Sequence, residues 1–270
     1  FQLIRPLDFL VLTDHAEAMG LAPMVRESNP VLLSSRRGRE VWEAFNAGGE
    51  QAMKAFGGLL ADVSAGVNPF ADIDMAGSVW PEFVKLADTF NQPGVFTAMT
   101  GFEWTSQPSG NNLHRIVVFA DGADKTSLVQ PFSMFDSQDP AKLWDYMERY
   151  EASTGGRVFA HVHNGNLSNG IAFTASTVDG TPMDAAYAAR RARWEPIMEI
   201  TQVKGDGETH PYLSPDDEFA DFERWDVANL DGSATKTKDM LRYEYGRSAL
   251  LTGLEVEAKV GANPYDFGFN

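Results

Sequence analysis

Residues 7–15 read LDFLVLTDH, an apolar run that ends in the polar residues Thr13, Asp14 and His15. A short, continuous apolar run of this kind is typical of a strand that is buried on both faces of a parallel sheet. Asp14 and His15 would then lie at the carboxyl end of that strand. In parallel α/β sheets and barrels this end carries the active site, so the stretch indicates both the fold class and the face where chemistry takes place.

Further strands and helices are expected along the rest of the chain. The other apolar, β-rich runs are Val95–Gly101, Arg115–Ala120, Arg157–Val162 and Pro196–Val203. Amphipathic helical patterns cover Glu40–Phe56, Trp80–Phe90, Ala141–Tyr150, Met183–Trp194, Asp216–Trp225 and Lys238–Leu251. Two of these helices are preceded by an N-cap candidate and a proline, Asp139-Pro140 and Ser214-Pro215. This alternation predicts an α/β fold with a largely parallel sheet, open or closed into a barrel, in a single domain.

Composition narrows the classes of function. The 270 residues include 22 Lys and Arg against 38 Asp and Glu, a net charge of −16, which argues against nucleic-acid binding by general electrostatics. The chain has no cysteine, so any metal ion must be held by His, Asp, Glu and carbonyl oxygens. No apolar run approaches the roughly 18–20 residues that span a bilayer, and a soluble protein without a membrane span is expected.

Histidines gather at the ends of the predicted strands. Four of the five lie in or beside apolar runs: His15, His114, His161 and His163. One such histidine is typically a packed core residue, whereas four favour metal binding, and the carboxylate of Glu103 could bridge two ions. His161 and His163 would share one face of a strand, while Asp14 and His15 would point to opposite faces, so that one of these two orients a ligand.

Other charged residues are open to more than one interpretation. Glu199 lies within an apolar run, where an unpaired carboxylate would cost several kcal/mol, so we expect a partner: Arg or Lys, a metal ion or its water. His210 lies in a turn-rich loop and either closes over a substrate or is plain surface. The Arg190–Arg193 run is interpreted as the solvated face of a helix rather than an anion site. Phosphate-binding loops, nucleophile elbows and H-E-x-x-H motifs are absent from the sequence.

The Thr-Asp-His end of the first run resembles the PHP superfamily, the polymerase and histidinol phosphatase metallohydrolases. More closely, the chain is similar to the bacterial family catalogued as domain of unknown function 3604. The motifs that carry this likeness, in the family's order, are Thr13-Asp14-His15, TGFEWT at 100–105, NLHR at 112–115, HNGNLS at 163–168 and MEITQVKG at 198–205. They run over nearly the whole chain.

The resemblance implies a distorted seven-stranded (β/α) barrel, a TIM-like fold of the PHP type, with two or three divalent ions at its mouth. His15 would bind one ion, Glu103 would bridge two, and His114 with His163 would complete the second site. The family's H-x-H and D-x-H motifs would precede Phe1 and follow Asn270, so the chain looks cut from a longer protein. Residues 1–270 are therefore expected to form one PHP-like domain, incomplete at both ends.

The leading functional hypothesis is hydrolysis of a small phosphoester by a hydroxide that bridges divalent ions about 3.5–4 Å apart. The expected ligands of these Mn, Zn or Fe ions are Asp14, His15, Glu103, His114, His161, His163 and Glu199. The expected catalytic residues are Glu103, His163 and Lys204, and the expected substrate contacts are Arg115, Asn164 and His210. Arg115 and Lys204 could instead balance buried acids. The alternatives are an amidohydrolase-like C–N or carboxylic ester hydrolase and a non-catalytic scaffold, and the compartment stays open between bacterial periplasm and cytoplasm.

Overall fold

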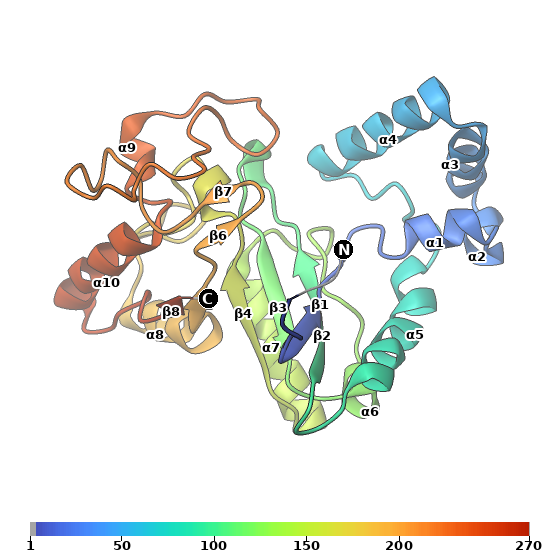
Figure 1. Ribbon diagram of the computed structural model, residues 1–270, viewed down its shortest axis with the longest axis horizontal. Helices are drawn as coiled ribbons and strands as arrows, with labels where there is room; N and C mark the ends of the chain where they lie inside the picture. The colour runs from blue at the N-terminus through green and yellow to red at the C-terminus, as the bar shows by residue number, and fades with distance from the viewer. Residues whose placement is uncertain (1–3, 270) are drawn as a thin grey trace. The chain divides into compact units, whose positions relative to one another are not determined.

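The computed structural model describes residues 4–269 (Figure 1). Contacts divide the chain into two compact units. Unit 1 consists of Phe1–Trp104, Val118–Asp136 and Glu148–Arg157, and unit 2 consists of Thr105–Val117, Ser137–Met147 and Val158–Asn270. The strand β3 (Arg115–Phe119) and the helix α7 (Pro140–Thr154) each contribute residues to both units. Each unit contains a hydrophobic cluster of its own.

Unit 1 contains the first two strands, β1 (Phe9–Leu12) and β2 (Thr97–Trp104), which pair in parallel. The predicted strand over residues 7–13 is therefore confirmed. The one predicted over residues 95–101 starts two residues later and runs on to Trp104. Both strands belong to a parallel pair, as the continuous apolar runs indicated.

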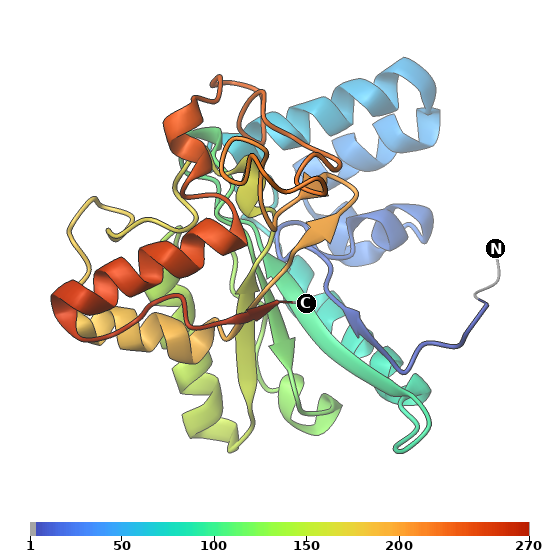
Figure 2. The same cartoon turned by 60° about the vertical axis from the view of Figure 1, so that its left-hand side comes forward.

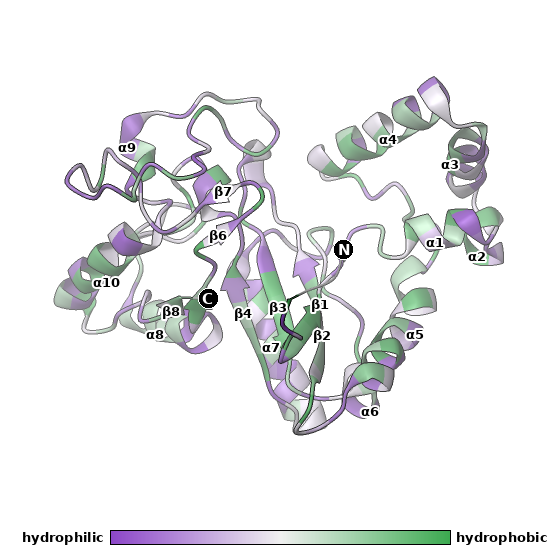
Figure 3. Ribbon diagram, viewed as in Figure 1, coloured by the Kyte–Doolittle hydropathy of each residue, from purple (hydrophilic) through white to green (hydrophobic). Residues whose placement is uncertain are grey.

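Helices occupy most of the chain between β1 and β2. They are α1 (Leu21–Arg26), α2 (Pro30–Ser34), α3 (Arg36–Ala47), α4 (Gly49–Ser64) and α5 (Met75–Phe90), with α6 (Ala123–Thr126) later in the unit. Figure 3 shows hydrophobic and hydrophilic residues on the same helical ribbons, as expected of amphipathic helices. Apolar side chains of α1 to α5, together with Phe70 from the turn between α4 and α5, form a cluster of Met24, Leu32, Val41, Leu59, Phe70 and Met75. The helix predicted over residues 40–56 is two helices, because the chain turns at Gly48 with φ 69°, which glycine adopts readily.

Unit 2 contains three parallel strands, β4 (Val158–Val162), β5 (Ile197–Met198) and β8 (Gly268–Phe269). A short antiparallel pair, β6 (Thr201–Gln202) and β7 (Gly205–Asp206), follows β5. The helical segments are η1 (Pro108–Gly110), η2 (Gly165–Leu167), α8 (Ala185–Trp194), α9 (Lys238–Leu241) and α10 (Gly246–Val260). Figures 1 and 2 both show α8 and α10 side by side. The core cluster consists of Val162, Ala172, Phe173, Met198, Ala249 and Tyr265.

The two proline-based helix starts have opposite outcomes. The Asp139-Pro140 prediction is confirmed, because α7 begins at Pro140 and Asp139 Oδ1 accepts the N–H of Ala141 at 2.9 Å. The helix predicted over residues 216–225 is wrong, since this segment consists of turns. There Asp217 Oδ1 accepts the N–H of Phe219 at 3.0 Å, a local side-chain hydrogen bond of the kind that competes with helix formation.

The predicted distorted (β/α) barrel with seven strands is wrong. Within residues 4–269 the main sheet has six strands in the order β1-β2-β3-β4-β5-β8, and no pairing closes it. A barrel requires every strand to have a neighbour on both sides, whereas β1 and β8 end this order. The regular β/α alternation also fails, because five helices separate β1 from β2 and only the short helix η1 separates β2 from β3. The fold is a mixed α/β fold with an open sheet.

None of the helices within residues 4–269 is long and apolar enough to cross a membrane.

Candidate functional site

In unit 1, the ends of β1 and β2 bring His15 and Glu103 together. Parallel pairing continues past β1, since the Glu103 N–H donates to the Asp14 carbonyl and the Ala16 N–H donates to the Glu103 carbonyl, both at 2.9 Å. His15 Nδ1 lies 3.5 Å from Glu103 Oε2. The Glu103 side chain is buried, while the His15 ring is about half exposed at 55%. Asp14 contributes its backbone to this arrangement and is exposed.

In unit 2, the ends of β4 and β5 bring His163 and Glu199 together. The register pairs Val162 with Met198. His163 directly follows Val162 at the end of β4, and Glu199 directly follows Met198 at the end of β5. His163 Nδ1 lies 3.0 Å from both carboxylate oxygens of Glu199, and the Asn164 N–H donates to Glu199 Oε2 at 3.1 Å. The partner that the sequence required for Glu199 is therefore an imidazole.

Asn164 follows this pair in an uncommon conformation. Its φ is 53°, in the left-handed region that residues other than glycine seldom occupy. The side chain is buried, and among residues 4–269 neither its Oδ1 nor its Nδ2 has a hydrogen-bond partner. Backbone strain and an unpaired buried amide both cost free energy, and such costs concentrate at functional sites.

The two other strand histidines of unit 2 are buried. The His114 carbonyl accepts the N–H of His163 at 3.2 Å, so the backbones of these two predicted ligands are in contact. His161 Nδ1 lies 3.2 Å from the Val162 carbonyl oxygen. Because a carbonyl only accepts hydrogen bonds, the proton of the neutral ring is on Nδ1, and Nε2 is an acceptor. Burial lowers the pKa of His161 and favours the neutral ring.

Lys204 and His210 lie in the segment after β5. Lys204 is half-buried, and its carbonyl accepts a hydrogen bond from Asn166 Nδ2 at 3.1 Å. His210 is buried, which excludes the interpretation of this residue as plain surface. Its Nδ1 accepts the N–H of Tyr212 at 3.0 Å, so Nε2 carries the proton and donates to Asp226 Oδ2 at 3.1 Å. This hydrogen bond lowers the pKa of Asp226.

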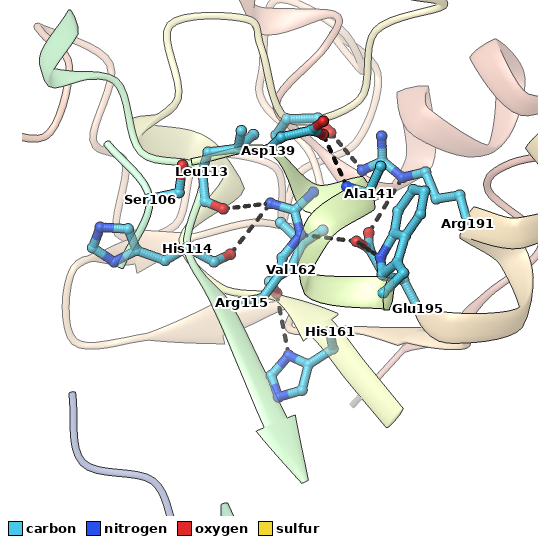
Figure 4. A network of polar contacts seen from close by, with 12 residues as sticks. Ser106, Leu113, His114, Arg115, Asp139, Ala141, His161, Val162, Arg191 and Glu195 are labelled. Carbon is cyan, nitrogen blue, oxygen red and sulfur yellow. Dashed lines mark hydrogen bonds and ion pairs between the residues drawn. The ribbon is translucent and has the colours of Figure 1, made fainter. Parts of the chain in front are cut away.

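A buried ionic cluster in unit 2 was missed by the sequence interpretation (Figure 4). Arg115 Nε and Trp144 Nε1 donate to Glu195 Oε1 at 3.0 and 3.2 Å, and Arg191 Nε lies 3.2 Å from Glu195 Oε2. Burial alone raises the pKa of Glu195, but the two guanidinium charges outweigh it and hold this pKa below its usual range. The interpretation of the Arg190–Arg193 run as a solvated face is wrong for Arg191. The four-residue spacing of Arg191 and Glu195 was the available signal.

Arg115 also fixes the backbone around two predicted metal ligands. Arg115 is fully buried. Of the two interpretations from the sequence, substrate contact and balancing of a buried acid, the second requires such burial. Arg115 Nη1 donates to the carbonyl of Leu113 at 2.7 Å and, more weakly, to that of His114 at 3.4 Å. The same His114 carbonyl accepts the N–H of His163. Arg115 is therefore placed to position this strand end.

The donor atoms fit a divalent ion in type but not in number. Imidazole nitrogen and carboxylate oxygen suit Mn, Zn and Fe. Each unit brings together one histidine and one glutamate, His15 with Glu103 and His163 with Glu199. Among residues 4–269, however, no group of three or more His, Cys, Asp or Glu could hold a metal ion. Each pair therefore supplies part of a coordination shell.

Comparison with known proteins gives one assignment. No curated protein and no solved structure matches the chain. The family described as "Protein of unknown function (DUF3604)" matches residues 1–270, a span that includes both histidine–glutamate pairs and the ionic cluster. The chain belongs to the DUF3604 family.

Proposed function

We propose that the protein is a metal-dependent hydrolase related to the PHP superfamily and acts on a small phosphoester. The observation that carries this proposal is the presence of two histidine–glutamate pairs, each built where two parallel strands end. Ligands of open α/β sheets bind at the carboxyl ends of the strands. Two such pairs offer the nitrogen and oxygen donors that divalent ions prefer.

His15 and Glu103 would hold an ion in unit 1, and His163, with His114 beside it, would hold one in unit 2. Bound divalent ions would activate water and neutralise charge on the phosphoryl oxygens. Glu199 has a different role, because both of its oxygens lie 3.0 Å from His163 Nδ1. A carboxylate that accepts a hydrogen bond from one ring nitrogen orients the other toward a metal. Glu199 would therefore be a positioning residue, and Nε2 would be the atom of His163 left to hold the ion.

Two residues remain for the substrate. The buried amide of Asn164 has a donor and an acceptor without partners among residues 4–269, and either could contact a phosphoryl or hydroxyl group. Lys204 is half-buried and supplies a positive charge. Because the chain carries a net charge of −16, a small substrate that meets local positive charge is favoured over a polyanion.

The test combines metal analysis with hydrolysis assays on the purified chain. Metal content is measured after incubation with Mn²⁺, and activity is measured with p-nitrophenyl phosphate, bis(p-nitrophenyl) phosphate and p-nitrophenyl acetate. We expect bound metal and phosphoester cleavage, and we expect Glu103→Gln to lose the ion of unit 1 and the cleavage. The matched control is Glu82→Gln, which changes an exposed glutamate of unit 1.

Two outcomes would overturn the proposal. Cleavage of the acetate ester alone would support the alternative of a carboxylic ester hydrolase. Less than one tightly bound ion per chain, together with no hydrolysis of any substrate, would support the alternative of a non-catalytic scaffold.

A further inference from the structure

A cavity of about 560 Å³ in unit 2 lies beside the Arg115–Glu195–Arg191 cluster, and two buried cations, Arg115 and Arg191, line it. This volume lies within the range of small-molecule sites. Its lining combines cationic, phenolic and apolar side chains, among them Arg115, Arg191, Tyr187, Tyr243, Leu113 and Ile171. Among the described residues that line it, none is Asp or Glu.

The three buried charged side chains of this cluster do not balance one another. Arg115, Arg191 and Glu195 are all buried and carry a net charge of +1 between them. For both arginines, Glu195 is the carboxylate whose charge acts on them. An excess buried charge is unfavourable unless another group offsets it.

One donor of this cluster is also unused. Arg115 donates through Nε and Nη1, but within residues 4–269 its Nη2 has no hydrogen-bond partner. Figure 4 shows the Arg115 guanidinium nitrogen without a dashed line on the side of Asp139 and Ala141, away from Glu195. Asp139 is half-buried, and its Oδ1 caps the start of α7 by accepting the Ala141 N–H. Arg115 itself and Pro140, the first residue of α7, are among the residues that line the cavity.

We propose that this cavity binds an organic carboxylate. A carboxylate carries one negative charge, which balances the excess of +1, whereas a phosphate dianion would reverse the imbalance. Its oxygens would take up the free Nη2 donor of Arg115, and its apolar body would pack against Leu113 and Ile171. The site is distinct from the proposed hydrolytic function and does not depend on it.

Isothermal titration calorimetry of the full chain with benzoate tests this proposal. Benzyl alcohol serves as the neutral probe of the same shape, and inorganic phosphate as the second anion. We expect benzoate to bind, with benzyl alcohol and phosphate binding at least about tenfold more weakly. The variant Ala175→Glu places a negative charge in the cavity lining and should weaken benzoate binding at least about tenfold.

Two control variants separate charge from size and from folding. Ala175→Gln has nearly the same volume as Ala175→Glu without its charge and should retain binding. Ala189→Glu adds the same charge at an exposed position of α8 that is not among the described lining residues, and it should also retain binding. The proposal is overturned if no benzoate binding is measurable at millimolar concentration, if phosphate binds as well as benzoate, or if Ala175→Glu binds benzoate as tightly as Ala175→Gln.

Discussion

Replacing Glu195 by Gln tests the buried cluster of unit 2 directly. The side chain is 3% exposed and accepts hydrogen bonds from Arg115 and Trp144 while it ion-pairs with Arg191. Glutamine keeps the volume and one acceptor oxygen but removes the negative charge, so the three side chains would change from +1 to +2. Removing one partner of a buried ion pair typically costs about 3–5 kcal/mol. Such a loss is a large part of a total stability of roughly 5–15 kcal/mol.

The assay is urea unfolding of the wild type and Glu195→Gln, followed by circular dichroism and compared with a thermal melt. At about 2–4 °C per kcal/mol for a protein of this size, the expected fall in Tm is roughly 6–20 °C. Glu257→Gln, at an exposed position of α10, is the control and should change the free energy of unfolding by less than about 0.5 kcal/mol. A loss below about 1 kcal/mol in Glu195→Gln would refute the reasoning, because it would mean that the two arginines do not need this carboxylate.

Three further predictions concern acid stability, backbone packing and metal affinity. Burial alone raises the pKa of Asp121, but hydrogen bonds from the Arg157 N–H, Lys125 and Tyr150 outweigh it and lower this pKa below 3.8. The stabilisation by the Asp121 carboxylate is present above pH 3.8 and is lost as the pH falls through its lowered pKa. Asp121→Asn should therefore lower the free energy of unfolding by about 1.5–3 kcal/mol at pH 7 and by much less at pH 2. An equal loss at both pH values in urea unfolding would contradict this. A Cβ at Gly38 would lie 1.9 Å from the Leu32 carbonyl oxygen, whereas one at Gly57 would meet nothing within 4 Å. In thermal melts we therefore expect Gly38→Ala to destabilise the protein by about 1–3 kcal/mol and Gly57→Ala to stabilise it by about 0.5–1 kcal/mol. A Gly38→Ala protein that is more stable than the Gly57→Ala protein would contradict the close approach of residue 38 to the Leu32 carbonyl. Glu199→Gln should weaken Mn²⁺ binding about 10–100-fold in calorimetric titration because it removes the group that orients His163, and unchanged affinity would rule out that role.

Local features of the fold could be predicted from the sequence. The strand at residues 9–12 and the start of α7 at Pro140 follow from a continuous apolar run and a capping signal. The break between α3 and α4 had a signal as well, the Gly48-Gly49 dipeptide. These features depend on residues that are close together in the sequence.

Long-range features could not be read in this way. Whether a sheet closes into a barrel depends on which strands pair at its edges, and apolar patterning does not specify this. The sequence required a partner for Glu199 but could not choose among Arg, Lys and a metal, since His163 becomes its neighbour only through the β4–β5 register. Arg191 was misjudged because an arginine run on a helix is usually exposed, and here one member turns into the core to meet Glu195.

The most direct test of the proposed metal chemistry is an anomalous-difference map from crystals grown with Mn²⁺. We predict an anomalous peak about 2.0–2.3 Å from Nε2 of His163, while Nδ1 keeps its contact with Glu199. A map with no anomalous peak at His163 and none at the His15–Glu103 pair would contradict the proposal that this chain uses divalent ions.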